Sequence, residues 1–177
     1  MEDVKFITRR EWRAVPPSKN YIKILPNKII IHHYGYKMIR TKTKSSKLFN
    51  GDITIQNLQR NHMNAHGLID IKFHFIIAPN GDVYEGRPLN VAGCHCKKQD
   101  NFSIAIMLFG NYNVEQPTRE QIHSFLQLLK HIRKTYKHID ISRSLYSHSD
   151  LAFTLCPGHH LSNMIGMIKN RKGVNYD

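Results

Sequence analysis

Three side chains in this sequence have the chemistry of metal ligands: His32, His148 and Cys156. His32 ends a short β-branched segment, and His148 and Cys156 lie eight residues apart in a Pro- and Gly-containing loop. Imidazole nitrogen and thiolate sulfur suit Zn²⁺, and a catalytic zinc site keeps three protein ligands and one open position. The spacing is not that of a zinc finger. The pattern therefore leaves two interpretations open: a metal site, or histidines that pack in the core or lie on the surface.

The elements that must position these groups alternate between strand and helix. Short apolar or β-branched runs predict strands at residues 28–34, 73–78, 103–109 and 144–148. The Asn80-Gly81 pair predicts a hairpin that returns through residues 83–86. A helix is expected from a cap at Asp52 or Thr54 to Gly67.

Two further helices complete the predicted fold. Thr118 and Gln121 form a capping box before an amphipathic segment that ends near Tyr136, and a short helix is expected at 161–168. Interleaved strands and helices predict an α/β fold. We expect a single domain over residues 1–177, with a central mixed β-sheet flanked by helices.

Length and composition exclude several classes of protein. The chain has 177 residues, of which 41% are hydrophobic and 22% charged, as in a globular domain rather than a disordered chain. No apolar run approaches the ~18–20 residues of a membrane helix, and the first residues show no secretory signal. The cysteines number three, and Cys94 and Cys96 are too close for a relaxed bridge, which argues against a disulfide framework.

Positive charge is the other compositional signal. Lys and Arg number 26 against 13 Asp and Glu, which gives a formal net charge of +13. Such charge attracts polyanions, including nucleic acid, anionic cell-wall polymer and acidic membranes. Nucleic-acid binding is an alternative that the sequence does not favour, because the densest basic stretch has no interleaved aromatics and matches no nucleic-acid-binding motif. That stretch contains Lys37, Arg40, Lys42, Lys44 and Lys47.

Several segments together resemble the family of peptidoglycan recognition proteins and type 2 N-acetylmuramoyl-L-alanine amidases, which includes short phage lysozymes of the amidase type. ITRREW at 7–12 resembles the family's opening, and IIIHH at 29–33 its first metal strand. Residues 55–87, which include KFHFIIAPNGDVYEGR, resemble its helix, strand and hairpin. AGCHCKKQDNFSIAIMLFGNY at 92–112 and SHSDLAFTLCPG at 147–158 resemble its core strand and second metal loop.

The resemblance implies a ligand set and a reaction. In this family one Zn²⁺ is bound by two histidines and one cysteine, which match His32, His148 and Cys156. Thr154 stands where the family has a Thr or Lys that faces the metal-bound water. The implied reaction is hydrolysis, by metal-activated water, of the amide between the lactyl group of N-acetylmuramic acid and L-alanine. The implied partners are peptidoglycan or muropeptides, and we expect a monomer.

Two positions depart from the family pattern. Phe73 occupies the position of the family's catalytic Tyr, and Met107 that of the Glu used by a second branch. Neither of the usual acid–base groups is present. One alternative is hydrolysis in which Tyr34, Tyr36 or His33 replaces the missing hydroxyl, which requires an approach to within ~3 Å of the reacting atoms. The other is a peptidoglycan-binding module with little or no activity.

The resemblance also implies substrate contacts. His33 and Tyr34 directly follow the first ligand, and His95 matches a family His on the wall of the substrate groove. Arg87 ends the hairpin, where it is expected to contact glycan or peptide. These four residues are the predicted substrate-binding set.

Two other pairs have a spacing that metals accept. Cys94 and Cys96 flank a histidine, which leaves a second metal site open, although no fourth ligand is evident. His62 and His66 lie four apart on the first helix, where packing is the expected role. The chain has no cysteine at the disulfide that secreted animal members carry beside this helix. This agrees with synthesis in the cytoplasm, as for a phage or virus protein released on lysis.

Overall fold

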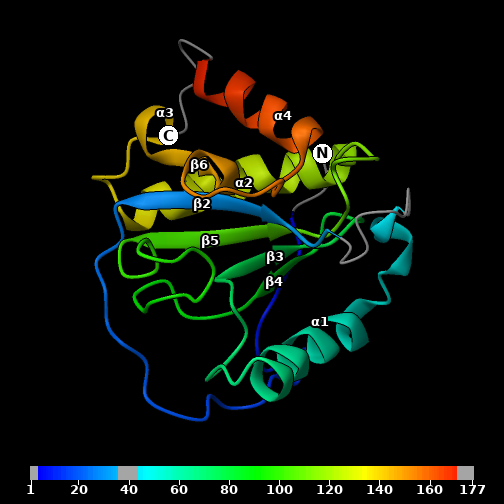
Figure 1. Cartoon of the computed structure of the whole chain (residues 1–177), viewed down its shortest axis with the longest axis vertical. Helices are drawn as coiled ribbons and strands as arrows, with labels where there is room; N and C mark the ends of the chain where they lie inside the picture. Colours follow the sequence, from blue (N-terminus) through cyan, green and yellow to red (C-terminus); the bar gives the residue numbers. More distant parts are fainter. Residues whose placement is uncertain (1–3, 36–43, 171–177) are drawn as a thin grey trace.

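A six-stranded mixed sheet forms the centre of the molecule in this computed structural model, which describes residues 4–35 and 44–170 (Figure 1). The strand order is β1-β4-β3-β5-β2-β6, and neighbours are parallel except for the β3–β4 hairpin. The α/β fold with a central mixed sheet is therefore confirmed. The strands are β1 (Phe6–Ile7), β2 (Lys28–His33), β3 (Phe75–Ile77), β4 (Val83–Glu85), β5 (Ser103–Leu108) and β6 (Leu145–Ser147).

The two central strands, β2 and β5, set the direction of the candidate site residues. They pair in parallel from Lys28 opposite Ser103 to His33 opposite Leu108, and every residue of β5 is buried. Successive side chains of a strand point to opposite faces. Ile29 and Ile31 therefore pack in one core, whereas His32 contacts Phe73 of the other.

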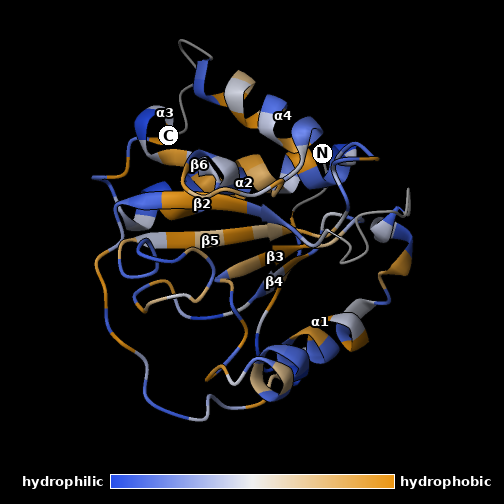
Figure 2. Ribbon diagram, in the orientation of Figure 1, coloured by the Kyte–Doolittle hydropathy of each residue, from blue (hydrophilic) through white to orange (hydrophobic). Residues whose placement is uncertain are grey.

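Helices cover both faces of the sheet (Figure 1). On one face α2 (Arg119–Thr135) and α4 (His159–Asn170) enclose a core that includes Phe125, Leu129 and Ile165. On the other face α1 (Gly51–Arg60), continued by a π-helical turn at Asn61–Ala65, covers a core that includes Trp12 and Ile55. Apolar residues gather on the strands and on the helix sides that face them (Figure 2).

Short helical segments connect these elements. They are η1 (Ser45–Leu48), α3 (Ile141–Ser144) and η3 (His148–Asp150), and η3 directly follows β6. No helix among the described residues has the length and apolar character needed to cross a membrane.

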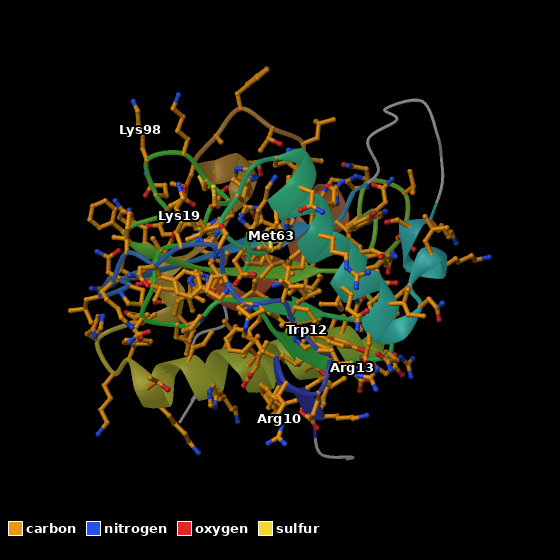
Figure 3. The ribbon with its side chains drawn as sticks, turned by 90° about the horizontal axis from the view of Figure 1, so that it is seen from below. Arg10, Trp12, Arg13, Lys19, Met63 and Lys98 are labelled. Carbon is orange, nitrogen blue, oxygen red and sulfur yellow. The ribbon has the colours of Figure 1, made fainter. Side chains whose placement is uncertain are left out.

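The basic residues are exposed at separate places on the described surface. In the view from the α1 side, Lys98 lies on the opposite edge from Arg10 and Arg13, and all three are exposed (Figure 3). Of the densest basic stretch, Lys44 and Lys47 are exposed, and Lys37, Arg40 and Lys42 lie outside the described residues.

Of the two predicted helix N-caps, one is confirmed and the other is wrong. Thr118 caps α2, since its hydroxyl accepts from Gln121 N and the Gln121 side chain accepts from Thr118 N. The predicted cap of α1 at Asp52 or Thr54 is wrong, because the helix begins at Gly51 after Asn50. The Thr54 hydroxyl instead accepts the Asn50 N–H from within the first turn, at 2.7 Å.

We expect Thr118→Ala to lower the free energy of unfolding by about 1 kcal/mol, because an orphan N–H at the start of α2 loses its acceptor. Urea unfolding followed by circular dichroism measures this change. Thr135→Ala, at the exposed end of the same helix, is the matched control and should change stability by less than about 0.5 kcal/mol. Equal effects of the two substitutions would contradict the capping role.

Candidate metal centre and binding groove

His32, His148 and Cys156 meet at the carboxyl edge of the sheet. β2 and β6 are parallel neighbours, with Ile31 opposite Ser147. The next residues, His32 in β2 and His148 directly after β6, therefore lie side by side. One ligand atom from each of the three side chains lies within 4.8 Å of the other two. Cys156 Sγ is 3.7 Å from His32 Nδ1, and the two imidazole centroids are 4.4 Å apart. We call these three residues the metal cluster.

The donors and spacing of the metal cluster fit Zn²⁺. Tetrahedral zinc with bonds of about 2.0 Å to nitrogen and 2.3 Å to sulfur separates those ligands by about 3.5 Å, close to the 3.7 Å between Nδ1 of His32 and Sγ of Cys156. Nδ1 of His148 is buried and has no hydrogen-bond partner. A buried nitrogen lone pair without a donor is costly, and a cation at this position would satisfy it.

Burial puts the two imidazoles in the protonation state that ligation needs. Desolvation holds the pKa of His32 well below its usual value and also lowers the pKa of His148, so both rings are neutral near pH 7. Desolvation raises the pKa of Cys156 to about 12. A cation is therefore required to displace the thiol proton, and metal binding should release protons.

The loop that carries Cys156 is held by backbone contacts. The His33 N–H donates to Cys156 Sγ at 3.4 Å, and the Thr154 hydroxyl accepts from Cys156 N at 3.2 Å. Gly158 has φ +87°, and a Cβ there would approach the Tyr112 carbonyl carbon to 2.4 Å. Only glycine meets both conditions, so the sharp turn after Cys156 is built into the sequence.

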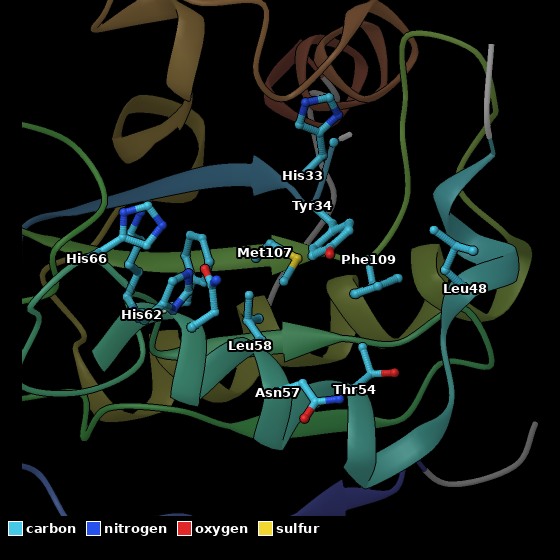
Figure 4. A pocket seen from close by; sticks show the side chains of 14 residues that line it. His33, Tyr34, Leu48, Thr54, Asn57, Leu58, His62, His66, Met107 and Phe109 are labelled. Atoms are coloured by element: carbon cyan, nitrogen blue, oxygen red, sulfur yellow. Dashed lines mark hydrogen bonds between the residues drawn. The ribbon is translucent and has the colours of Figure 1, made fainter. Parts of the chain in front are cut away.

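A groove of about 760 Å³ opens beside the metal cluster, between α1 and the ends of β2 and β5 (Figure 4). Phe73 and Met107 both line it. Met107 pairs with His32 across the sheet, and the Phe73 ring lies 5.4 Å from the His32 ring. Phe73 and Met107, which stand where the family has its acid–base groups, therefore place apolar side chains next to His32.

An aromatic pair forms another part of the groove lining. Tyr34 stacks on Phe109 with a centroid distance of 4.2 Å and is 41% exposed (Figure 4). The predicted alternative His33 also borders the groove, but its Nδ1 accepts the Tyr112 N–H at 3.3 Å. Burial, followed by the charge of His148, lowers the pKa of His33 to about 4. Tyr36 lies outside the described residues, so among the described alternatives only Tyr34 brings a hydroxyl to the groove.

His95 lies behind the metal cluster rather than on the groove wall. Its side chain is fully buried, and its Nδ1 is 2.9 Å from Nε2 of His32. It is absent from the described lining of the groove. The predicted substrate contact is therefore corrected, because a ring enclosed in this way cannot reach a ligand.

Arg87 lies among backbone carbonyl groups. Its guanidinium donates to the carbonyls of Ile71 at 2.6 Å and Ala92 at 2.8 Å, with longer bonds to Gly93 and Asp70. The residue is 5% exposed and does not line the groove. These contacts tie three loop segments together, so Arg87 supports the structure, and its predicted contact with substrate stays a prediction.

The structure also identifies groove residues that the sequence analysis missed. Thr54, Asn57 and Asn61 point from α1 and its π-helical continuation into the groove. Lys72 is the only Lys, Arg, Asp or Glu among the described lining residues. Polar positions at i, i+3 and i+7 on one side of the first helix were the available signal.

The two other pairs with metal-compatible spacing form no metal cluster within the described residues. His62 and His66 both line the groove, and Nδ1 of His62 also accepts the Lys72 N–H at 3.2 Å. Cys94, Cys96 and Cys156 are all free thiols.

A mixed sheet with helices on both faces is the class of α/β fold seen in the solved peptidoglycan recognition protein and amidase structures that this chain resembles. The chain belongs to the N-acetylmuramoyl-L-alanine amidase family, whose model matches residues 22–159. The family resemblance of the sequence motifs is thereby confirmed.

Relatives of known name agree with this assignment. Peptidoglycan-recognition protein SC2 of Drosophila melanogaster is 33% identical over 171 residues, which cover 96% of this chain and 89% of the relative. The crystal structure of Drosophila peptidoglycan recognition protein SD has a TM-score of 0.81 and 25% identity, and covers 97% of this chain and 98% of that one. A Drosophila PGRP-LB mutant in complex with tracheal cytotoxin has a TM-score of 0.76 and 26% identity, and covers 91% and 92%.

We expect Arg87→Met to lower the free energy of unfolding by about 2–4 kcal/mol, because it leaves several buried carbonyls without a donor while keeping much of the side-chain volume. Chemical denaturation measures the change. The control Arg10→Met removes an exposed guanidinium and should alter stability by less than about 0.5 kcal/mol. A fully stable Arg87→Met protein with weakened muropeptide binding would instead support the substrate contact.

Proposed function

We propose that this protein is a zinc-dependent N-acetylmuramoyl-L-alanine amidase that cleaves the lactyl–L-alanine amide of peptidoglycan. The observation that carries the proposal is the convergence of His32, His148 and Cys156 beside a groove, with a buried His148 nitrogen that has no hydrogen-bond partner. Membership of the amidase family supports it further.

The metal cluster would hold the ion through two neutral imidazoles and one thiolate, which leaves one tetrahedral position open. When bound there, zinc supplies a Lewis acid for the amide carbonyl and makes water more acidic, which together address a poor electrophile and a poor nucleophile. Thr154 lies two residues before Cys156 and is half-buried. Its hydroxyl accepts the Cys156 N–H, so its own proton is available for a developing oxyanion.

The groove has the chemistry to bind a muropeptide. The stacked pair of Tyr34 and Phe109 offers an aromatic surface to the apolar face of a sugar ring. Asn57 and Asn61 offer amides that can pair with sugar hydroxyls and peptide groups. Lys72 adds a positive charge to the groove that can pair with a stem-peptide carboxylate. The complex of PGRP-LB with tracheal cytotoxin is a relative's precedent for such a ligand.

A second candidate function is muropeptide binding with little or no hydrolysis. The specific observation in its favour is the apolar border of the metal cluster, where Phe73 and Met107 offer no proton donor or acceptor. General acid–base catalysis typically contributes 10²–10⁴ in rate. An amidase without general acid–base catalysis would hydrolyse the amide slowly. With an intact groove it would still bind muropeptides.

The amidase proposal is tested by digestion of purified peptidoglycan, with free peptides measured by mass spectrometry. We expect peptide release that a chelator abolishes and that Cys156→Ala lowers at least ~10²-fold, because one of three ligands is lost. The control Cys94→Ala removes a free thiol outside the metal cluster and should leave the rate unchanged. Stoichiometric zinc without peptide release would favour the binding module, and release that survives chelation would exclude the metal mechanism.

Restoring the missing hydroxyl separates the two candidate functions. We expect Phe73→Tyr to raise kcat for peptide release by about 10–100-fold, because a phenol beside His32 adds a proton donor at the reacting amide. Tyr34→Phe is the matched control, since it removes the hydroxyl that already borders the groove. A large loss in Tyr34→Phe with no gain in Phe73→Tyr would show that Tyr34 has taken over the role.

A further inference from the structure

A chain of hydrogen bonds leads away from the metal cluster through buried side chains. Nε2 of His32 lies 2.9 Å from Nδ1 of His95, and Nε2 of His95 lies 3.3 Å from the Ser103 hydroxyl. That hydroxyl donates to the Gln99 carbonyl at 2.7 Å. Asp100 Oδ1 is also 3.6 Å from Nε2 of His95. None of these contacts faces the groove.

The end of this hydrogen-bond network at Ser103 and Asp100 determines which ring nitrogens carry protons. A carbonyl oxygen only accepts, so the single hydroxyl proton of Ser103 points to Gln99, and the Ser103 oxygen is left to accept. The Asp100 carboxylate also accepts. The Ser103 oxygen therefore requires a proton on Nε2 of His95, and the Asp100 carboxylate 3.6 Å away favours a proton there electrostatically. In a neutral imidazole the other nitrogen, Nδ1, then carries a lone pair.

The tautomer of His95 in turn determines that of His32. Nδ1 of His95 accepts, so Nε2 of His32 carries the proton and donates it. The lone pair of His32 is then on Nδ1, the nitrogen that lies 3.7 Å from Cys156 Sγ. The opposite tautomer would point a proton into the metal cluster and remove one ligand.

We propose that His95 is a positioning residue for the metal centre, which accepts a hydrogen bond from the Nε2–H of His32 and so presents the Nδ1 lone pair of His32 to a divalent cation. Ser103 acts one step further out, because its oxygen fixes the tautomer of His95, and the Asp100 carboxylate favours the same tautomer. This inference rests on the proposed metal site but not on amide hydrolysis.

The surrounding backbone is built to hold the His95 ring in this place. Asp100 Oδ1 accepts the backbone N–H groups of His95 at 2.6 Å and Cys96 at 3.0 Å, which fixes the loop. A Cβ at Gly93 would approach Cδ2 of His95 to 2.4 Å. Glycine at 93 therefore leaves the space that the ring occupies. Groups that orient a metal-binding histidine typically change metal affinity by 10–100-fold when they are removed.

The test is the affinity of the metal-free protein for Zn²⁺, measured by competition with a chromophoric chelator. We expect His95→Phe, which keeps the ring volume and loses the acceptor, to weaken binding by about 10–100-fold. His95→Asn returns an acceptor oxygen near the position of Nδ1 and should recover most of the affinity. Equal affinities for wild type and His95→Phe would overturn the proposal, as would equal losses in the Phe and Asn variants.

His74→Phe is the matched control for removal of a buried imidazole. The His74 side chain is buried, and its ring nitrogens contact only the backbone, at Ala105 N and Val91 O. We expect it to lower thermal stability while zinc affinity stays within about threefold of wild type. An affinity loss as large as that of His95→Phe would contradict a specific role for the His95 acceptor.

A measurement on the unmutated protein avoids any failure of a variant to fold. Imidazole nitrogen chemical shifts at pH 7 distinguish protonated from unprotonated ring nitrogens in the metal-free chain. We expect a proton on Nε2 and none on Nδ1 in both His32 and His95. A proton on Nδ1 of His95 would overturn the proposal. Absence of peptide release with these results intact would end the amidase proposal and leave the positioning role standing.

Discussion

The parallel pairing of β2 with β6 is the constraint on which the candidate site depends. It sets Ile31 opposite Ser147, and the next residue of each segment is a histidine. Neither histidine could be placed by its own local sequence, because the two are more than 100 residues apart. Strand register brings them together at the carboxyl edge of the sheet, where loops are free to carry functional groups. Cys156 then needs only the short turn after η3 to join them.

The two faces of the sheet have different tasks. The face under α2 and α4 is the larger apolar core, which packs against β2 and β5. The face under α1 contains the smaller core and the groove. The alternation of β2 is what separates the two, since Ile31 belongs to the first and His32 to the second. The larger core therefore lies behind the strands that carry a partly enclosed site.

The sequence predicted the fold and the metal cluster well because both follow from strong patterns. Apolar strands, the Asn80-Gly81 turn and the Thr118 capping box are local signals, and the cluster followed from motifs shared with a family. The contacts of His95 and Arg87 were not predicted, for a common reason. A motif gives the position of a residue in the chain, but the direction of its side chain depends on which backbone groups surround it after folding. Lys72 was missed because an isolated lysine has no spacing pattern that would assign it to a groove.

The metal cluster also has a consequence for the whole chain. A cation held by His32, His148 and Cys156 would act as a cross-link between an early strand and the last fifth of the molecule. The three cysteines of the protein are free thiols, so no disulfide links these two segments among the described residues. Closing so long a loop removes entropy from the unfolded chain, and mass action then couples folding to the free metal concentration. Resistance to heat and proteolysis would therefore follow the zinc supply of the surroundings.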